Sequence, residues 1–402
     1  MTAAATAPMT GLRVVDFSTL VAGPWATRLM ADCGAEVIKV ETVGEGDLLR
    51  YAPPIVDGMS RVFAQFNRGK KSVALDLKSA ADVETARRLI NRADVVVENF
   101  RPGVMDRFGL GFAEAARRNP SLVYCSISGF GQDGPLAGEA AYAPVVHAMT
   151  GFDMAVLAGE GDGAAPRAAS VMIADVVAAS YAFGAVQTAL LRRERFGVGG
   201  FVDVTLIESM MSLVAIQLQE AQAPSPLRSA AFRPVRTADG YIVSPLVNAR
   251  NFLALFSVIG RPDWATDALM ATPGAIARRR REVEDQLAAW ATGRSSAECV
   301  RLLNAAGAPC GAYATAADAL AHPHLAARGS FAELEDADGP FKVLSPPFRI
   351  GGRASVAGDF AARLGEHTAE VLAQLDSPPP RAEGPGVGGS SGHTAVREQA
   401  RT

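Results

Sequence analysis

Short apolar runs recur through the first half of the chain, and each is bounded by polar or glycine-containing turns. Runs that stay apolar on consecutive positions predict strands covered on both faces. Six segments fit this description: Gly11–Phe17 (GLRVVDF), Glu36–Glu41 (EVIKVE), Ser72–Leu77 (SVALDL), Asp94–Glu98 (DVVVE), Leu122–Ser128 (LVYCSIS) and Phe201–Leu206 (FVDVTL).

Helical patterns lie between these predicted strands. Examples are Trp25–Asp32, Ala80–Asn91 and Glu208–Ala221. The longest is Val171–Arg195, where arginines in the last turn and the following Gly197 favour a helix end. Strands that alternate with helices form βαβ units, so the pattern predicts an α/β fold with a parallel sheet.

The composition changes at Ala223-Pro224-Ser225-Pro226, which predicts a linker. We therefore expect an N-terminal tail over 1–10, a large domain over 11–222, and a linker with a smaller α/β domain over 223–328. Residues 329–376 are expected to return and pack on the large domain. The Pro/Gly/Ser-rich residues 377–402 are expected to form a disordered tail.

Composition excludes several classes of function. Among 402 residues, 39 Lys and Arg nearly balance 42 Asp and Glu, giving a net charge of −3, which argues against a nucleic-acid binder. The four cysteines form no CxxC pair and no HExxH occurs, so no metal site is predicted. No signal peptide and no membrane span are predicted, and we expect a cytoplasmic location.

The glycine motifs do not indicate nucleotide binding. No GxGxxG follows the first predicted strand, where Leu20-Val21-Ala22-Gly23-Pro24 stands, and no P-loop occurs. The match Gly129–Gly134 (GFGQDG) precedes a proline rather than a helix, which favours an ordinary glycine-rich loop.

Two features could carry chemistry. The first is a set of basic residues beside predicted strands, which either clamp phosphates at the carboxyl edge of the sheet or form a solvated surface: Arg68, Lys70, Lys71, Arg101 and Arg107. The second is Asp175, an acid alone in the apolar stretch VMIADVVAA. It is either the N-cap of the long helix or a nucleophile or general base.

The combination of segments resembles the family III CoA-transferases, the group of formyl-CoA transferase and carnitine CoA-transferase. The same superfamily holds α-methylacyl-CoA racemases. The resemblance covers nearly all of residues 10 to 376 and rests on GLRVVDFSTLVAGP, GAEVIKVE, NRGKKSVALDLKS, ADVVVENFRPGVMDRFGL, NPSLVYCSISGFGQDGPL, the long ADVVAASYAFGAVQTALLRRERFGVGGFVDVTLIESM, and LLNAAGAPCGAY, HPHLAARG and LGEHTAEVLAQL.

The resemblance implies a Rossmann-like large domain, a small domain and an interlocked homodimer. Coenzyme A or acyl-CoA would be a substrate, with no tightly bound cofactor, and the partner substrate would be a carboxylic acid. The CoA-contacting stretch matches Asn99, Phe100, Arg101 and Arg107. Lys70 and Lys71 lie in a matching basic stretch, and Val21 and Ala22 fall on the loop against the thioester.

Asp175 matches the catalytic aspartate of the family, so the resemblance implies attack on the acyl-CoA carbonyl, a mixed anhydride and then an aspartyl-CoA thioester. The racemases instead use a histidine where this chain has Tyr142, which favours a transferase, and Tyr142 is expected to take part in binding the CoA substrate. An α-methylacyl-CoA racemase or epimerase, or a CoA-binding protein without turnover, remain the alternatives.

Two departures from the family pattern stand near Tyr142. Ala143 replaces an acid common in relatives, and His147 stands where relatives often carry Gln. His147 is then either part of a substrate-specific repacking or a displaced acid/base. The glycine-rich loop of some oxalate-active members is missing, which disfavours a formyl/oxalate substrate pair.

Overall fold

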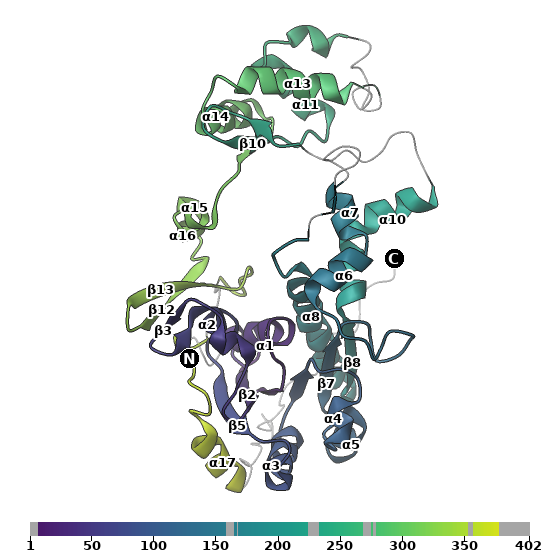
Figure 1. The fold of residues 1–402 in the computed structure, drawn as a ribbon, viewed down its shortest axis with the longest axis vertical. Helices are drawn as coiled ribbons and strands as arrows, with labels where there is room; N and C mark the ends of the chain where they lie inside the picture. The colour runs from purple at the N-terminus through teal and green to yellow at the C-terminus, as the bar shows by residue number, and fades with distance from the viewer. Residues whose placement is uncertain are drawn as a thin grey trace, which may run out of the picture.

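The computed structural model describes residues 7–157, 165–166, 168–223, 233–267, 275, 279–352 and 357–377. A six-stranded sheet forms the centre of the lower unit in Figure 1. All its neighbouring strands are parallel. Their order is β5 (Lys71–Leu75), β2 (Glu36–Thr42), β1 (Arg13–Asp16), β6 (Val95–Glu98), β7 (Val123–Ser128) and β8 (Gly200–Thr205).

The order of the strands reverses between β1 and β6. From β1 the chain builds outward through β2 to β5, then crosses back and builds outward on the other side through β6, β7 and β8. The loops that follow β1 and β6 therefore diverge at the carboxyl edge of the sheet. Such a switch point leaves a crevice where ligands bind in open α/β sheets.

Alternation along the strands produces two hydrophobic cores. Val14, Val95 and Val97 face a core shared with α1 (Ala22–Asp32) and α8 (Ile173–Phe196). Val15 and Val96 face the opposite core, which includes residues of α3 (Ala80–Asn91) and α5 (Phe112–Arg118). Because both faces are covered, consecutive positions are apolar, as the sequence pattern predicted.

The remaining helices of this unit are short. They are α2 (Arg61–Asn67), α4 (Val104–Arg107), α6 (Ala143–Met149), α7 (Phe152–Leu157), α9 (Leu206–Met211) and α10 (Ala215–Gln222), with 3-10 turns at Leu48–Tyr51 and Ser212–Val214 and a hairpin of β3 (Ile55–Val56) and β4 (Met59–Ser60).

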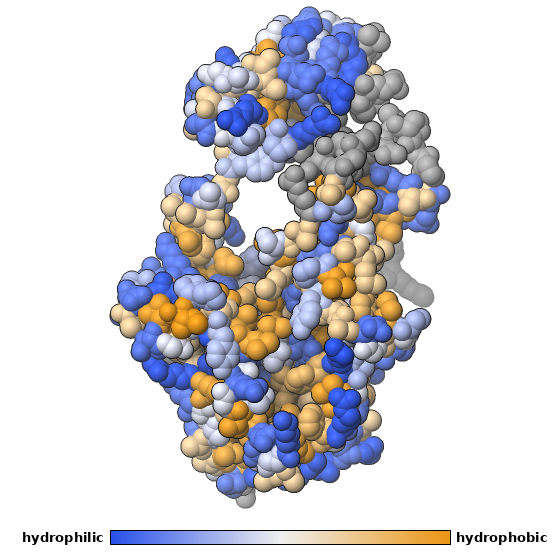
Figure 2. Space-filling model, viewed as in Figure 1, coloured by the Kyte–Doolittle hydropathy of each residue, from blue (hydrophilic) through white to orange (hydrophobic). Residues whose placement is uncertain are grey.

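A second unit has its own core and lies at the top of Figure 1. The strands β9 (Val235–Arg236), β10 (Tyr241–Val243) and β11 (Gly311–Ala312) form an antiparallel sheet. Around it lie α11 (Ala249–Val258), a 3-10 turn at Pro262–Ala265, α13 (Arg280–Ala291) and α14 (Ser296–Ala306). The space-filling view shows an open gap between this unit and the sheet unit (Figure 2).

After the small unit the chain returns to the large one through α15 (Ala316–Leu320), α16 (Pro323–Ala327) and the hairpin of β12 (Phe331–Asp336) and β13 (Gly339–Leu344). The last helix, α17 (Thr368–Asp376), packs Val371 and Leu375 into the α3 core. At the edge strand β5, the backbone amide of Ala74 donates to the Thr368 hydroxyl and that of His367 donates to the carbonyl of Ser72. The return segment thus covers an edge that would otherwise stay unpaired.

Of the described helices, α8 is long and apolar enough to cross a membrane by length and composition, and 28% of its most apolar window is buried. In this fold α8 packs against α1, β7, β8 and α9. Ala174, Ala178 and Ala182 make up part of its buried stripe, while Val176 and Tyr181 are exposed. Much of its apolar surface is therefore uncovered in a single chain.

The six predicted strands and the parallel sheet are confirmed, with ends shifted by one or two residues. The predicted helix Glu208–Ala221 is wrong as a single element, because a 3-10 turn at Ser212–Val214 separates α9 from α10. The sequence did not predict α2 or the β3–β4 hairpin. The predicted tails at 1–6 and 378–402, and linker residues 224–226, lie outside the described residues.

Candidate active site

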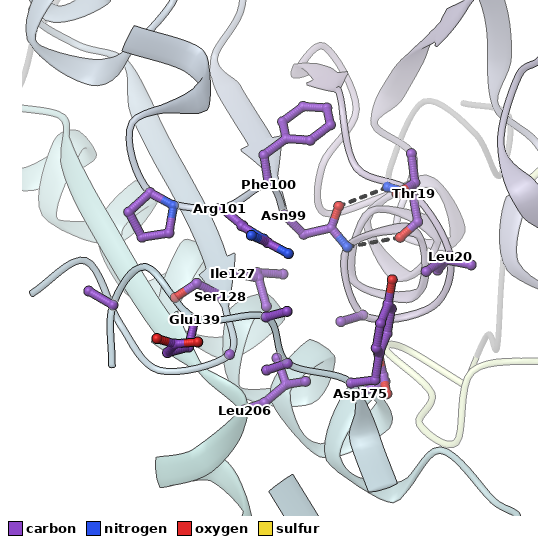
Figure 3. A pocket seen from close by; sticks show the side chains of 17 residues that line it. Thr19, Leu20, Asn99, Phe100, Arg101, Ile127, Ser128, Glu139, Asp175 and Leu206 are labelled. Atoms are coloured by element: carbon purple, nitrogen blue, oxygen red, sulfur yellow. Dashed lines mark hydrogen bonds between the residues drawn. The ribbon is translucent and has the colours of Figure 1, made fainter. Parts of the chain in front are cut away.

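A cavity of about 260 Å³ opens at the switch point of the sheet (Figure 3). Six segments line it, and each lies at the end of a parallel strand or near the start of a helix. They supply Thr19, Leu20 and Ala22 after β1, Asn99 to Pro102 after β6, Ile127 to Gly129 at the end of β7, Ala137 and Glu139 to Tyr142 before α6, Asp175 in α8, and Leu206 after β8.

The loop after β1 is held by buried charges. Leu20 has a φ of 63°, a left-handed conformation that costs energy for a leucine. Its amide donates to the Asp47 carboxylate, at 3.1 and 3.2 Å to the two oxygens. Lys39 donates to the carbonyl of Ser18 at 2.7 Å and pairs with Asp47 at 2.9 Å. These contacts hold the loop in a single conformation beside the cavity.

The loop after β6 is bound to the first loop. The Asn99 side chain accepts from the amide of Thr19 and donates to the carbonyl of Thr19, both at 2.8 Å (Figure 3). Next to it, the amide of Phe100 donates to the Glu98 carboxylate at 2.8 Å. Burial raises the pKa of Glu98 to about 7, although the Ser126 hydroxyl and this amide oppose the shift. Because both its oxygen and its nitrogen bond to Thr19, the Asn99 side chain holds the two loops together rather than being free to bind a ligand.

Asp175 lies in the first turn of α8. The N-cap of this helix is Met172, which provides no side-chain cap, so the interpretation of Asp175 as N-cap is wrong. Burial raises the pKa of Asp175 to about 6, and a bond from its own backbone amide opposes the shift. The result is a carboxylate that is partly removed from water and yet ionised at neutral pH.

The structure brings together six of the ten predicted site residues around this cavity, namely Ala22, Asn99, Phe100, Arg101, Tyr142 and Asp175. Val21 lies just outside the lining and is buried. Arg107, in α4, is exposed and also outside the lining. The proposed contacts of Val21 and Arg107 with CoA stay predictions.

For Lys70, the structure corrects the prediction of a contact with CoA. Its ammonium is buried and donates to Asp16 at 3.0 Å, to the carbonyl of Pro24 at 2.9 Å and to Asn67 at 2.8 Å. All three of its protons are thus used inside the protein. Burial alone would raise the pKa of Asp16, but Lys70, Lys39 and two hydroxyls lower it to about 2.

Lys71 is also outside the cavity lining. It is the first residue of β5, so it enters the sheet at the amino end of that strand, whereas the cavity lies at carboxyl ends. Its ammonium pairs with Glu36 at 2.9 Å and with Glu370 at 2.8 Å. Lys71 therefore lies away from this cavity, toward Glu36 at the amino end of β2, and its contact with CoA stays a prediction.

Sequence reasoning missed several lining residues, including Thr19, Leu20, Ser128 and Glu139. The position of Thr19 and Leu20 directly after a predicted strand was the available signal for those two. No pattern marks Glu139, because only the path of the loop before α6 brings it to the cavity. The described residues hold no group of three or more His, Cys, Asp or Glu side chains suited to a metal ion.

A partly desolvated carboxylate in a crevice at the switch point of a parallel sheet is typical of an α/β enzyme. The family model described as CoA-transferase family III matches residues 9–368. The chain belongs to this family, as the sequence resemblance indicated, and it is an enzyme that transfers CoA between a thioester and a carboxylic acid.

Relatives agree with this assignment. Succinate–glutarate CoA-transferase of Agrobacterium fabrum is 33% identical over 394 residues, covering 92% of this chain and 96% of that protein. Acetyl-CoA:oxalate CoA-transferase of Acetobacter aceti is 35% identical, covering 80% and 84%. A CAIB/BAIF family protein from Brucella suis has a similar structure, with a TM-score of 0.78 and 31% identity over 92% of this chain and 99% of the other.

Proposed function

We propose that this enzyme carries CoA from an acyl-CoA thioester to a second carboxylic acid through covalent adducts of Asp175. One observation carries the proposal: the Asp175 carboxylate lines the same cavity as the loops after β1 and β6. A carboxylate is a weak nucleophile in water, and its partial removal from water, which raises its pKa to about 6, makes attack on a thioester feasible.

The steps balance without an added acid, base or ATP. An Asp175 oxygen bonds to the thioester carbonyl carbon, the C–S bond breaks, and CoA leaves as a thiolate from the mixed anhydride. The thiolate then attacks the aspartyl carbonyl and releases the first acid, leaving an aspartyl-CoA thioester. The acceptor carboxylate then attacks the aspartyl-CoA carbonyl and releases the thiolate, which leaves an anhydride between Asp175 and the acceptor. The thiolate attacks the acceptor's carbonyl carbon, which gives the new acyl-CoA and restores the Asp175 carboxylate.

Each attack places negative charge on a carbonyl oxygen. The helix α1 begins at the cavity with Ala22, and its N-cap Val21 supplies no side-chain cap. Pro24 has no N–H and the amide of Trp25 donates to the carbonyl of Val21, so the amides of Ala22 and Gly23 are the ones suited to stabilise this oxyanion.

We propose a short dicarboxylic acid as the acceptor. The support comes from the names of relatives, which include succinate–glutarate CoA-transferase and, in mouse, succinyl-CoA:glutarate CoA-transferase at 30% identity over 92% of this chain. A racemase is less favoured, because the residues described around the cavity include no histidine to face Asp175, and Tyr142 stands where the racemase histidine would.

The test uses succinyl-CoA as donor and glutarate as acceptor. We expect glutaryl-CoA to form, and hydroxylamine during turnover to convert Asp175 to a hydroxamate that mass spectrometry detects. Asp175→Ala removes the nucleophile, so it should lower kcat by about 10³-fold or more and abolish the adduct. Deuterium exchange at the α-carbon without CoA transfer would indicate the racemase instead. Thermal stabilisation by CoA with neither reaction would indicate a binding protein.

We also propose that the active form is a homodimer. Large apolar side chains stay exposed along one group of helices: Val145 and Met149 in α6, Met154 and Val156 in α7, Val176 and Tyr181 in α8, and Ile216 in α10. Exposed large apolar side chains gathered on neighbouring helices are typical of an obligate interface. The gap between the two units in Figure 2 is open to a second chain, as an interlocked arrangement requires.

A further inference from the structure

The first turn of α8 must satisfy amide groups that have no partner inside the helix. The amide of Ile173 donates to the carbonyl of Val171 at 3.0 Å, and that of Val176 donates to the carbonyl of Met172 at 3.2 Å. The amide of Asp175 donates to its own carboxylate. The amide of Ala174 still needs an acceptor, because the side chain of the N-cap residue Met172 accepts no hydrogen bond.

His147 of α6 supplies the missing acceptor. Its Nε2 accepts from the amide of Ala174 at 3.1 Å, although 27 residues separate the two. The side chain is fully buried, and its ring lies 5.7 Å from that of Phe152, centroid to centroid. Burial lowers the pKa of His147 against the opposing effect of Asp153, which favours the neutral ring that an acceptor nitrogen requires.

We propose that His147 is a positioning residue: it caps α8 from outside the helix, and so leaves the Asp175 carboxylate free to face the cavity and react. The inference rests on the proposed role of Asp175. Asp175 follows Ala174 directly and is the acid in the first turn of α8, and an acid there readily accepts from such amides. A carboxylate that accepted this amide as well would be turned inward and be a weaker nucleophile.

The tautomer follows from the same contact. A neutral imidazole that accepts at Nε2 carries its proton on Nδ1. Nδ1 has no hydrogen-bond partner in the part of the chain that the structure describes. The ring is thus bound to the protein through its acceptor nitrogen, which is the arrangement of a cap and not that of a displaced acid/base in the cavity.

The test compares three variants. His147→Leu removes the acceptor, His147→Gln keeps one at a similar reach, and Val146→Ala removes a buried neighbour on α6 as a packing control. The ionisation of Asp175 is read as the pH midpoint of its labelling by a carbodiimide, which needs no substrate. Transfer from succinyl-CoA gives kcat and KM separately.

In His147→Leu the free amide should recruit the Asp175 carboxylate, so the labelling midpoint should fall by about one pH unit and kcat by about tenfold or more, with KM nearly unchanged. His147→Gln should stay within about threefold of the original kcat. The Val146→Ala midpoint should match the original protein.

An unchanged midpoint in His147→Leu, or the same shift in Val146→Ala, would overturn the inference. A shifted midpoint in a protein that forms no Asp175 adduct would uphold the cap and refute the proposed function. The imidazole tautomer offers a check without substitution, because nitrogen NMR of the intact protein should find the His147 proton on Nδ1. A proton on Nε2 would overturn the inference.

Discussion

The partial burial that would make Asp175 reactive also lowers the stability of the fold at neutral pH. The raised pKa means that the folded protein binds the carboxyl proton more tightly than the unfolded chain, whose aspartates have the ordinary value of 3.8. Stability contributed by this group is therefore present at acid pH and is lost as pH rises from about 4 to about 6. Above that range the fold bears the full cost of a partly desolvated charge.

Asp175→Asn should remove this cost and stabilise the inactive protein. We expect a gain of about 1–2 kcal/mol at pH 7.5, less than the full shift implies because water still reaches the side chain. The gain should vanish near pH 4. Urea unfolding at both pH values measures it, and a variant no more stable than the original at pH 7.5 would contradict the assigned burial.

Lys70 and Lys71 are sequence neighbours with opposite environments. Lys70→Ala leaves Asp16 buried without its ammonium partner and should destabilise the protein by about 3–5 kcal/mol. Lys71→Ala removes a partly exposed pair and should cost less than about 1 kcal/mol.

Chemical unfolding separates these two costs. Calorimetric titration with CoA, run on folded Lys71→Ala, should give the affinity of the original protein. A marked loss of affinity there would restore Lys71 as a CoA contact.

These lysines show why residue roles were harder to predict than elements. In NRGKKS both look like loop cations, yet one is an internal counter-ion, because only the fold reveals that Asp16 of β1 lies opposite. For Asp175 the sequence allowed a cap or a nucleophile. Met172 as the N-cap excludes the first role, and the amide of Ala174 donates to His147 of α6, a tertiary bond that no local pattern encodes.

Among elements, the junction of β1 and α1 sets the shape of the cavity. Gly23 stands in the first turn of α1, and a Cβ there would collide with Cβ and Oγ of Ser18. The glycine is thus required by close approach of the helix to the loop rather than by its backbone angles. Ser18 in turn is bound by Asp16 and Lys39, so it has no room to move.

Gly23→Ala should displace this loop. We expect a loss of stability of about 1–3 kcal/mol from overpacking, and a larger KM for the CoA thioester because Thr19 and Leu20 line the cavity. Gly293→Ala, at a site with nothing within 4 Å of the added carbon, is the matched control. Steady-state kinetics and thermal unfolding should separate the two variants, and equal behaviour would refute the close-approach argument.

Long, regular elements were predictable and short ones were not. The strands were evident from their apolar runs, and the helix Ala80–Asn91 has the predicted ends, preceded by Ser79, whose side chain accepts an amide of the first turn. The helix α2 is seven residues long, and the strands of the β3–β4 hairpin are two residues each. Such short elements are stabilised by tertiary contacts and are too short to show a local periodicity in the sequence.

At the scale of the whole molecule, the exposed apolar helices predict assembly. Tyr181→Glu puts a charge on the uncovered face of α8 and should shift the particle from dimer to monomer in sedimentation velocity, with loss of transfer activity. Val198→Glu, at an exposed apolar position in the turn before β8, is the control and should stay dimeric. A monomeric original protein with full activity would refute the dimer proposal.

The strand order explains why the site's location could be inferred more easily than its members. Alternating strands and helices predicted a parallel sheet, and parallel sheets place ligands at the carboxyl edge where the order reverses. The loops after β1 and β6 follow from that rule. The contribution of Glu139, from the long loop before α6, depends on a path with no regular pattern.

The return of the chain from the small unit has a consequence for how the protein is made. Val371 and Leu375 complete a core that otherwise consists of segments before residue 125, and His367 and Thr368 cover the edge of β5. During synthesis the strands and α3 are made before α17, so the edge of β5 and part of this core stay uncovered until α17 has emerged. Packing of the large unit thus awaits α17, and a chain truncated before Thr368 would leave an unpaired strand edge exposed to aggregation and proteolysis.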